Sequence, residues 1–288
     1  MSAVSSLIPR LSELFADFWT LMGVAALVTV MVGLMIIACR RPLSRMMRAR
    51  DDARAVQASH VGDPLRLGGV AIFIGLMAGA AAGVWQDAAL PALLILSAGP
   101  AVLAGLGEDL GFCVSPLRRL AAAGVSAFLA VLMLGVWVSR ADLPGLDPVM
   151  TIMPLAVLLT VALSGGFCHS TNLVDGMNGL ATTVILSAAV GLMLLAQDAG
   201  DRDLALIAAL LGAAMAGFLL LNWPFGTVFM GDAGSYGVGH VLIWIAILLA
   251  WRTPDIAVPA LLLPVLAVCR HVPLDHAARA APCPGVRA

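Results

Sequence analysis

Nine apolar runs constrain this chain more than any other feature, because most of them are long enough to cross a lipid bilayer. A bilayer core about 30 Å thick requires about 20 apolar residues in a helix. The runs cover residues 18–39, 67–85, 89–106, 119–138, 149–165, 179–196, 204–221, 236–251 and 256–269. The last run is short and contains Pro259 and Pro264, so we expect a short, kinked span there.

The composition agrees with a membrane protein and excludes a soluble one. Hydrophobic residues make up 61% and charged residues 11% of the chain, with a mean hydropathy of +1.01, against about 45–50% and about 25% in soluble domains. The net charge of -1 excludes a nucleic-acid-binding surface. We therefore predict an all-α, polytopic transmembrane helical bundle of about nine spans, with residues 1–270 forming a single integral-membrane domain.

Arginine placement predicts the orientation, since short cytoplasmic loops retain an excess of basic residues. The segment after the first run has the strongest signal, with Arg40, Arg41, Arg45, Arg48, Arg50, Arg54 and Arg66. Alternation then puts Arg118, Arg119 and Arg270 inside, and only Arg10, Arg140, Arg202 and Arg252 outside. The N-terminus is predicted to lie outside.

The same alternation puts on the cytoplasmic side every polar cluster whose side chains could take part in catalysis or ligand binding. These clusters are GDPLRLGG, GLGEDLGF, HSTNLVDGMNG and LNWPFGTVFMGDAGS. The opposite loops are short and contain scattered aspartates, and we expect them to be simple solvated connections.

Several side chains in these clusters are candidates for a catalytic or ligand-binding site. Glu108 and Asp109 are adjacent carboxylates directly after an apolar run, which is costly unless they are solvated, paired or bound to a cation. A spacing of three would put His169, Asn172 and Asp175 on one helix face. An interfacial helix cap and a glycine-rich helix break are the alternative explanations for these two patterns.

Asp232 lies in a glycine-rich segment that begins an apolar run, where free N–H groups of a helix start favour anions. Carboxylates and amides without a His/Cys cluster favour Mg²⁺, or Mn²⁺, over zinc. Such cations typically serve phosphate chemistry. The residues alone therefore predict a metal-dependent enzyme that acts on a phosphorylated substrate at the cytoplasmic face.

Four segments, in order, resemble the signatures of the polyprenyl-phosphate N-acetylhexosamine-1-phosphate transferase family, glycosyl transferase family 4. NLVDGMNGLA and VFMGDAGS, the latter preceded by LNWP, are similar to its two main motifs. PLRLGGVAIF resembles the segment that begins its second span, and GLGEDLGFCVSPLRRL resembles its acidic-pair loop. The family includes phospho-MurNAc-pentapeptide translocase and the enzymes that start O-antigen and enterobacterial common antigen synthesis.

The resemblance implies transfer of a sugar 1-phosphate from a UDP-sugar to undecaprenyl phosphate, with release of UMP, in cell-envelope polysaccharide or peptidoglycan synthesis. Asp109 would position or deprotonate the lipid phosphate, Glu108 would support it, and Asp175 would lie close to the metal–nucleotide site. Asn172 and Asp232 would bind Mg²⁺. A further set would bind substrate: Arg66, His169, Asn178, Gly179 and Asn222.

The expected partners are undecaprenyl phosphate, a UDP-sugar and membrane lipid, in a bacterial inner (plasma) membrane; the sequence leaves open a homodimer and the identity of the sugar. Residues 271–288 depart from the family, because they offer only His271, Asp275 and His276 where relatives have a histidine-rich loop. This tail resembles a truncated end. A non-catalytic member damaged at its C-terminus and a transporter are the two alternatives to an active transferase.

Overall fold

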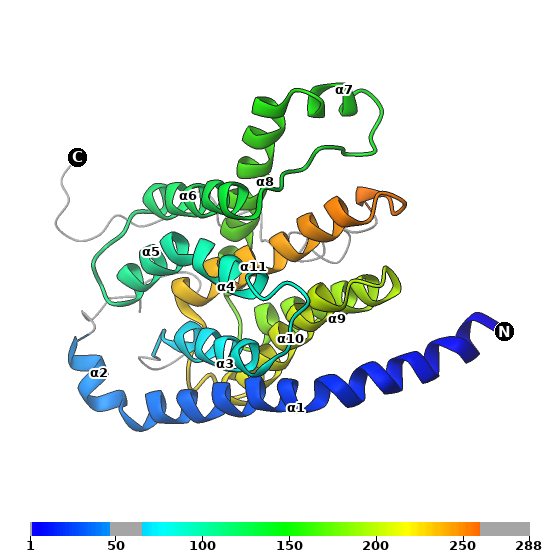
Figure 1. The fold of residues 1–288 in the computed structure, drawn as a ribbon. Coiled ribbons are helices and arrows are strands. Elements are labelled where there is room, and N and C mark those ends of the chain that lie inside the picture. The colour runs from blue at the N-terminus through cyan, green and yellow to red at the C-terminus, as the bar shows by residue number, and fades with distance from the viewer. Residues whose placement is uncertain (1, 47–64, 260–288) are drawn as a thin grey trace.

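The fold is a bundle of α-helices, as predicted (Figure 1). The structure is a computed structural model that describes residues 2–46 and 65–259. Its helices are α1 (Ser2–Ala38), α2 (Arg40–Met46), α3 (Gly68–Ala82), α4 (Leu90–Ser97), α5 (Gly99–Asp109), α6 (Pro116–Leu134), α7 (Asp147–Met150), α8 (Met153–Val174), α9 (Leu180–Asp198), α10 (Arg202–Asn222) and α11 (Gly231–Arg252).

Six helices in the described ranges are long and apolar enough to cross a membrane: α1 from Phe18, α6, α8, α9, α10 and α11. The pair α4 and α5 makes a seventh if it is one broken span, and α3 is a shorter apolar helix of 15 residues. Helices thus occur at the first eight predicted runs. The ninth run, 256–269, lies mostly outside the described residues, as do Arg270 and the tail 271–288.

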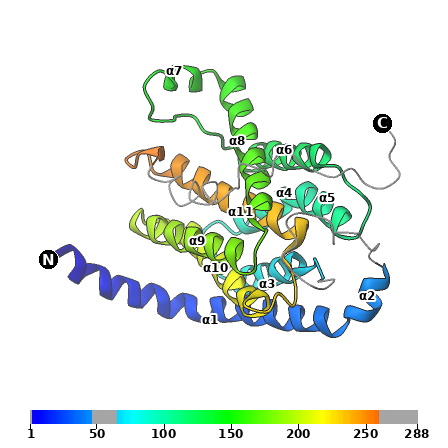
Figure 2. The ribbon, with the colours of Figure 1, turned by 180° about the vertical axis from the view of Figure 1, so that it is seen from behind.

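Helix α11 is the centre of the bundle (Figures 1 and 2). It is apolar around most of its circumference, and such a helix is stable where other helices cover every side. Seven helices contact it, namely α3, α4, α5, α6, α8, α9 and α10. By contrast, α1 packs only along one side of the bundle, against α3 and α10. The N-terminus of α11 is therefore fixed in position by its neighbours.

The third predicted run is broken, which its hydropathy did not indicate. α4 and α5 meet at Ala98 with a bend of 42°. Pro100 lacks an N–H group and so interrupts the helical hydrogen bonding. The Ser126 hydroxyl of α6 accepts a hydrogen bond from the Ala101 N–H at 2.9 Å, so the break leaves this buried group satisfied.

Two helix boundaries also differ from the sequence prediction. In both cases the helix extends further into a polar segment than expected. α8 continues past residue 165 to Val174, so His169 and Asn172 lie on a helix. α11 begins at Gly231 rather than at residue 236, so Asp232 lies in its first turn. Hydropathy misses these turns because their polar and glycine residues interrupt the apolar pattern.

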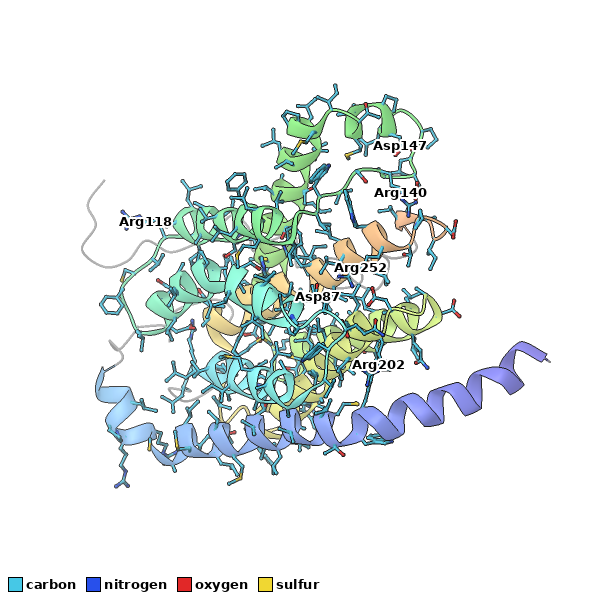
Figure 3. All side chains as sticks on the ribbon, viewed as in Figure 1. Asp87, Arg118, Arg140, Asp147, Arg202 and Arg252 are labelled. Atoms are coloured by element: carbon cyan, nitrogen blue, oxygen red, sulfur yellow. The ribbon has the colours of Figure 1, made fainter. Side chains whose placement is uncertain are left out.

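The loops at the opposite end are not simple solvated connections, contrary to expectation. Asp203 is buried and accepts hydrogen bonds from the N–H groups of Gln86 and Asp87 at 3.1 and 2.8 Å. Asp201 caps α10 and pairs with Arg252 at 3.0 Å. Figure 3 shows Arg118 at the end of the bundle away from Arg140, Arg202 and Arg252. The aspartates of this end therefore hold loops together.

Candidate active site

The first and last polar segments of the sequence lie side by side at one end of the bundle. Leu65 pairs with Val228 in a short parallel bridge, and the Phe229 N–H donates to the Leu65 carbonyl at 2.8 Å. The N–H groups of Gly68 and Gly69 donate to the carbonyls of Phe229 and Met230, at 2.8 and 2.7 Å. These bonds fix the start of α3 against the start of α11.

Glycines let two helices, α3 and α5, approach α11 at its first turn. A Cβ on Gly69 would lie 2.2 Å from the Gly234 nitrogen, and one on Gly105 would lie 2.5 Å from the Ala233 nitrogen. Gly231 has a φ of 75°, a conformation that favours glycine. A Cβ there would lie 2.7 Å from an oxygen of Asp109. The close approach brings the carboxylate of α5 to the backbone of α11.

Asp109 caps α11 from a neighbouring helix. Its two carboxylate oxygens accept hydrogen bonds from the N–H groups of Asp232 and Ala233, at 2.9 and 2.8 Å. The partial positive charge of a helix N-terminus stabilises such a carboxylate. Asp109 and its neighbour Glu108 are both buried. Asp109 is therefore a helix cap, as one alternative proposed, but it caps the adjacent helix α11 rather than its own helix.

Asp232 is the centre of a polar cluster formed by α6, α8 and α11. The Asn172 amide donates to one carboxylate oxygen at 2.8 Å and to the Ser235 hydroxyl at 2.9 Å. The buried Arg119 forms an ion pair with the other carboxylate oxygen. Its guanidinium also lies over the ring of Tyr236, 5.9 Å from the centroid. Arg118 is exposed and takes no part in this cluster.

His169 and Asn172 lie on α8, whereas Asp175 lies just past its end, so the predicted helix face holds only for the first two; all three side chains nevertheless approach α11. His169 Nδ1 lies 2.6 Å from the Tyr236 hydroxyl. Asp175, just past the end of α8, accepts a hydrogen bond from the Gly231 N–H. Burial raises the pKa of Asp175 to about 7, although the charge of Arg66 and that hydrogen bond act in the opposite direction.

Asn222, Asn178 and Gly179 hold loops beside the cluster. Asn222 is buried; its amide oxygen accepts from the Gly179 N–H at 2.6 Å, and its amide nitrogen donates to the Val228 carbonyl at 3.0 Å. Asn178 donates to the Pro224 carbonyl at 3.2 Å. Both amides therefore bridge the segments after α8 and α10. Their predicted contact with substrate remains a prediction.

Sequence reasoning did not single out Tyr236, the one tyrosine of the chain. It lies four residues after Asp232, so both side chains project from one face of α11. That spacing is the signal that could have identified it. Tyr236 is fully buried and joins Arg119 to His169.

The donor set fits a hard cation bound together with substrate. Among the described residues, no group of three or more His, Cys, Asp and Glu side chains could hold a metal ion. One carboxylate, Asp232, and one amide, Asn172, offer oxygen ligands. Mg²⁺ is typically bound by one or two carboxylates, with waters and substrate phosphates completing its coordination. These two residues would hold it.

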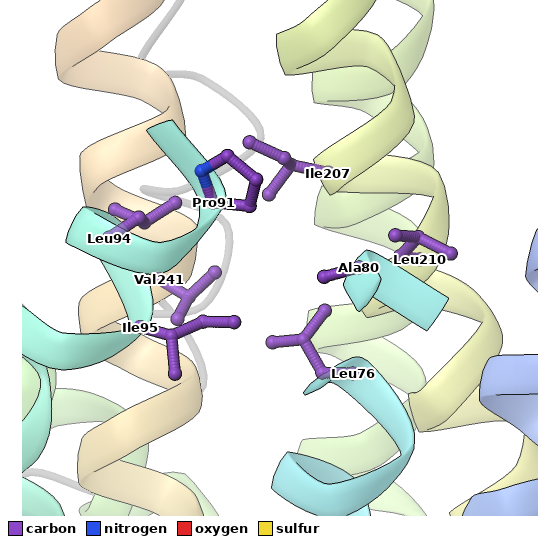
Figure 4. A pocket seen from close by; sticks show the side chains of 8 residues that line it. All are labelled: Leu76, Ala80, Pro91, Leu94, Ile95, Ile207, Leu210 and Val241. Atoms are coloured by element: carbon purple, nitrogen blue, oxygen red, sulfur yellow. The ribbon is translucent and has the colours of Figure 1, made fainter. Parts of the chain in front are cut away.

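An apolar cavity elsewhere in the bundle has a different character. It lies between α3, α4, α10 and α11, and eight apolar residues line it, Leu76 and Val241 among them (Figure 4). It offers no acid, base or metal ligand, so the polar cluster at Asp232 is the candidate active site.

Comparison with known proteins places much of the chain among phosphotransferases by similarity. The glycosyl transferase family 4 model matches residues 91–250, more than half of the chain. The chain is 30% identical to phospho-N-acetylmuramoyl-pentapeptide-transferase of Moorella thermoacetica, covering 78% of this chain and 73% of that protein. It is 26% identical to the probable undecaprenyl-phosphate N-acetylglucosaminyl 1-phosphate transferase of Bacillus subtilis, covering 69% and 56%.

A third relative is decaprenyl-phosphate N-acetylglucosaminephosphotransferase of Mycobacterium tuberculosis, 31% identical over 64% of this chain and 49% of that protein. The chain thus spans about half the length of the last two relatives. The matched region, residues 91–250, contains Asp109, Arg119, Asn172 and Asp232. The chain belongs to glycosyl transferase family 4.

Proposed function

We propose that this protein transfers an N-acetylhexosamine 1-phosphate from a UDP-sugar to undecaprenyl phosphate and releases UMP. The observation that carries the proposal is the cluster around Asp232, where a carboxylate, an amide, a guanidinium and a helix N-terminus meet. Phosphoryl transfer requires mainly positioning and charge neutralisation, which these groups supply. The relatives' names, which pair a polyprenyl phosphate with an N-acetylhexosamine phosphotransferase, support it.

In the proposed reaction, an oxygen of the lipid phosphate attacks the sugar-bearing phosphorus of the UDP-sugar. A new P–O bond forms, the P–O bond to UMP breaks, and UMP leaves with the electron pair. Mg²⁺ on Asp232 and Asn172 would neutralise the diphosphate. Arg119 stabilises the negative charge of the transferred phosphoryl group. Asp109 holds the N-terminus of α11 in place and faces the attacking phosphate, and Glu108 supports it.

The proposed orientation puts this site on the cytoplasmic side of a bacterial inner membrane. Six described arginines lie near the site end of the bundle: Arg40, Arg41, Arg45, Arg66, Arg118 and Arg119. Four described arginines, Arg10, Arg140, Arg202 and Arg252, lie near the other end. The excess at the site end agrees with the rule that cytoplasmic loops are richer in basic residues. A UDP-sugar is a cytoplasmic metabolite, so the site faces its donor.

The test is UMP release by the purified 288-residue protein in detergent. The assay supplies undecaprenyl phosphate, Mg²⁺ and, in turn, several UDP-N-acetylhexosamines. We expect release with at least one donor, its loss with EDTA, and its recovery with Mg²⁺ or Mn²⁺. Folded protein that releases no UMP from any donor would contradict the proposal and favour the non-catalytic alternative.

A further inference from the structure

The pairing of Arg119 with Asp232 is the feature that the proposed reaction does not explain. If Asp232 binds a divalent cation, its carboxylate should face that cation. In this structure, both of its oxygens instead meet donors of the chain: the positively charged Arg119 guanidinium and the neutral Asn172 amide N–H group. Arg119 therefore neutralises the charge of Asp232, and the Asn172 amide donates a hydrogen bond to it.

The orientation of Asn172 agrees with this. Its amide presents nitrogen to both Asp232 and Ser235, at 2.8 and 2.9 Å. A hard cation is ligated by oxygen and never by an amide N–H group. The amide must therefore turn over before Asn172 and Asp232 can share a cation.

Arg119 itself is held by few bonds. It is 9% exposed, yet its Nε makes no hydrogen bond to any described residue. Its guanidinium forms the ion pair with Asp232 and lies over the ring of Tyr236. A buried N–H without an acceptor is costly and would gain from a new partner. Guanidinium groups present several donors in a plane that matches phosphate oxygens.

We propose that Arg119 is a built-in counter-ion of Asp232, which keeps divalent cations off this carboxylate until the phosphate of a substrate draws the guanidinium away. Arg119 then gains an acceptor for Nε, Asn172 turns over, and the cation binds together with the substrate. The proposal rests on the proposed function for the location of the cation. It makes Arg119 a positioning residue for the cation in addition to its contact with phosphate.

The test is a Mn²⁺ titration of the full-length protein in detergent, without nucleotide or lipid, in which electron paramagnetic resonance measures free Mn²⁺. Arg119→Met removes the donors and keeps a long stem over Tyr236. We expect it to bind Mn²⁺ at least about tenfold more tightly than the wild type, since the competing ion pair is gone. A merely structural role for Arg119 predicts the opposite, because a damaged site binds more weakly.

Arg118→Met is the matched control. It removes the same charge from the adjacent, exposed position and should leave the Mn²⁺ affinity within about twofold of the wild type. Arg119→Gln keeps one donor group and should give a smaller gain in Mn²⁺ affinity than Arg119→Met. It replaces Arg119→Met if that variant does not fold. Adding Asp232→Asn to Arg119→Met should abolish the gain.

Equal Mn²⁺ affinities in the wild type, Arg118→Met and both Arg119 variants would overturn the counter-ion proposal. The transferase reaction would stand, since UMP release is measured separately. If Asp232→Asn does not remove the gain, the cation lies elsewhere, and both the counter-ion proposal and the metal ligands of the proposed function are wrong.

Discussion

Asn222 illustrates how a single buried amide can determine the geometry of the site. Its side chain joins the Gly179 N–H to the Val228 carbonyl, and both bonds are inaccessible to water. Asn222→Ala leaves both groups without a partner, at a cost of about 1–3 kcal/mol each. We expect a lower melting temperature in detergent and reduced UMP release. Asn178→Ala, which loses one more exposed bond, should cost less; equal effects of the two variants would contradict this role of Asn222.

The raised pKa of the Asp175 carboxyl predicts that the stability of the folded protein depends on pH. Burial raises its folded-state pKa from 3.8 to about 7, so folding favours the protonated carboxyl. This contribution is fully present below about pH 3.8 and is lost as the pH rises through about 7. Asp175→Asn lacks the titration. Its melting temperature relative to the wild type should therefore be higher at about pH 8 than at about pH 5. A difference that does not change with pH would contradict the assignment, and Asp198→Asn, at an exposed site, is the control.

The residues of the cluster were partly predictable from the sequence. The spacing of His169, Asn172 and Asp175 predicted a shared face, and Asp232 was identified beside its glycines. The partners Tyr236 and Ser235 were not singled out, and Arg119 was indistinguishable from Arg118. Adjacent positions on a helix differ by 100° in direction, and only the packing of α6 decides which of the two arginines is buried.

At the scale of helices, the contact between α5 and α11 positions Asp109. Gly105 lies against the backbone of Ala233, so Gly105→Ala must push the helices apart. Overpacking of this kind costs about 1–3 kcal/mol. It also lengthens the hydrogen bonds of Asp109 to the N-terminus of α11. We expect Gly105→Ala to lower the melting temperature of the protein and, by a larger fraction, its rate of UMP release.

Gly99→Ala is the matched control for this variant. It lies in the same helix, and a Cβ there would have no atom within 4 Å. Alanine also favours helix more than glycine does. Gly99→Ala should keep wild-type activity and stability. If Gly105→Ala behaves like Gly99→Ala, the close approach of α5 and α11 is not required.

Helix positions followed from hydropathy, whereas breaks and polar ends did not. The first eight apolar runs each coincide with a helix or, for α4 and α5, with a bent pair. The bend depends on Pro100 together with a hydroxyl from α6, a contact distant in sequence. The first turn of α11 depends on Asp109, which lies 123 residues earlier. Local patterns contain no information about such partners.

For the whole molecule, the orientation in the membrane can be tested with native cysteines. Cys39 and Cys113 are exposed and lie near the site end, whereas Cys168 is buried. After Cys269 and Cys283 are replaced by serine, a membrane-impermeant maleimide should label Cys39 and Cys113 only from the cytoplasmic side. Asp198→Cys, at the other end of α9, should be labelled only from outside. Labelling in the reverse pattern would contradict the proposed orientation.

The transfer of an intact sugar 1-phosphate is the central claim for the whole molecule, and an isotope tests it most directly. The protein is incubated with undecaprenyl phosphate, Mg²⁺ and the UDP-N-acetylhexosamine that supports UMP release, labelled with ³²P at the sugar-bearing phosphorus. We predict that the label moves into the lipid fraction, that α-labelled donor leaves its label in water-soluble UMP, and that Asp232→Asn loses the transfer while Asp198→Asn keeps it. Sugar-bearing phosphorus that remains water-soluble while sugar enters the lipid would contradict the account, because the protein would then transfer the sugar alone.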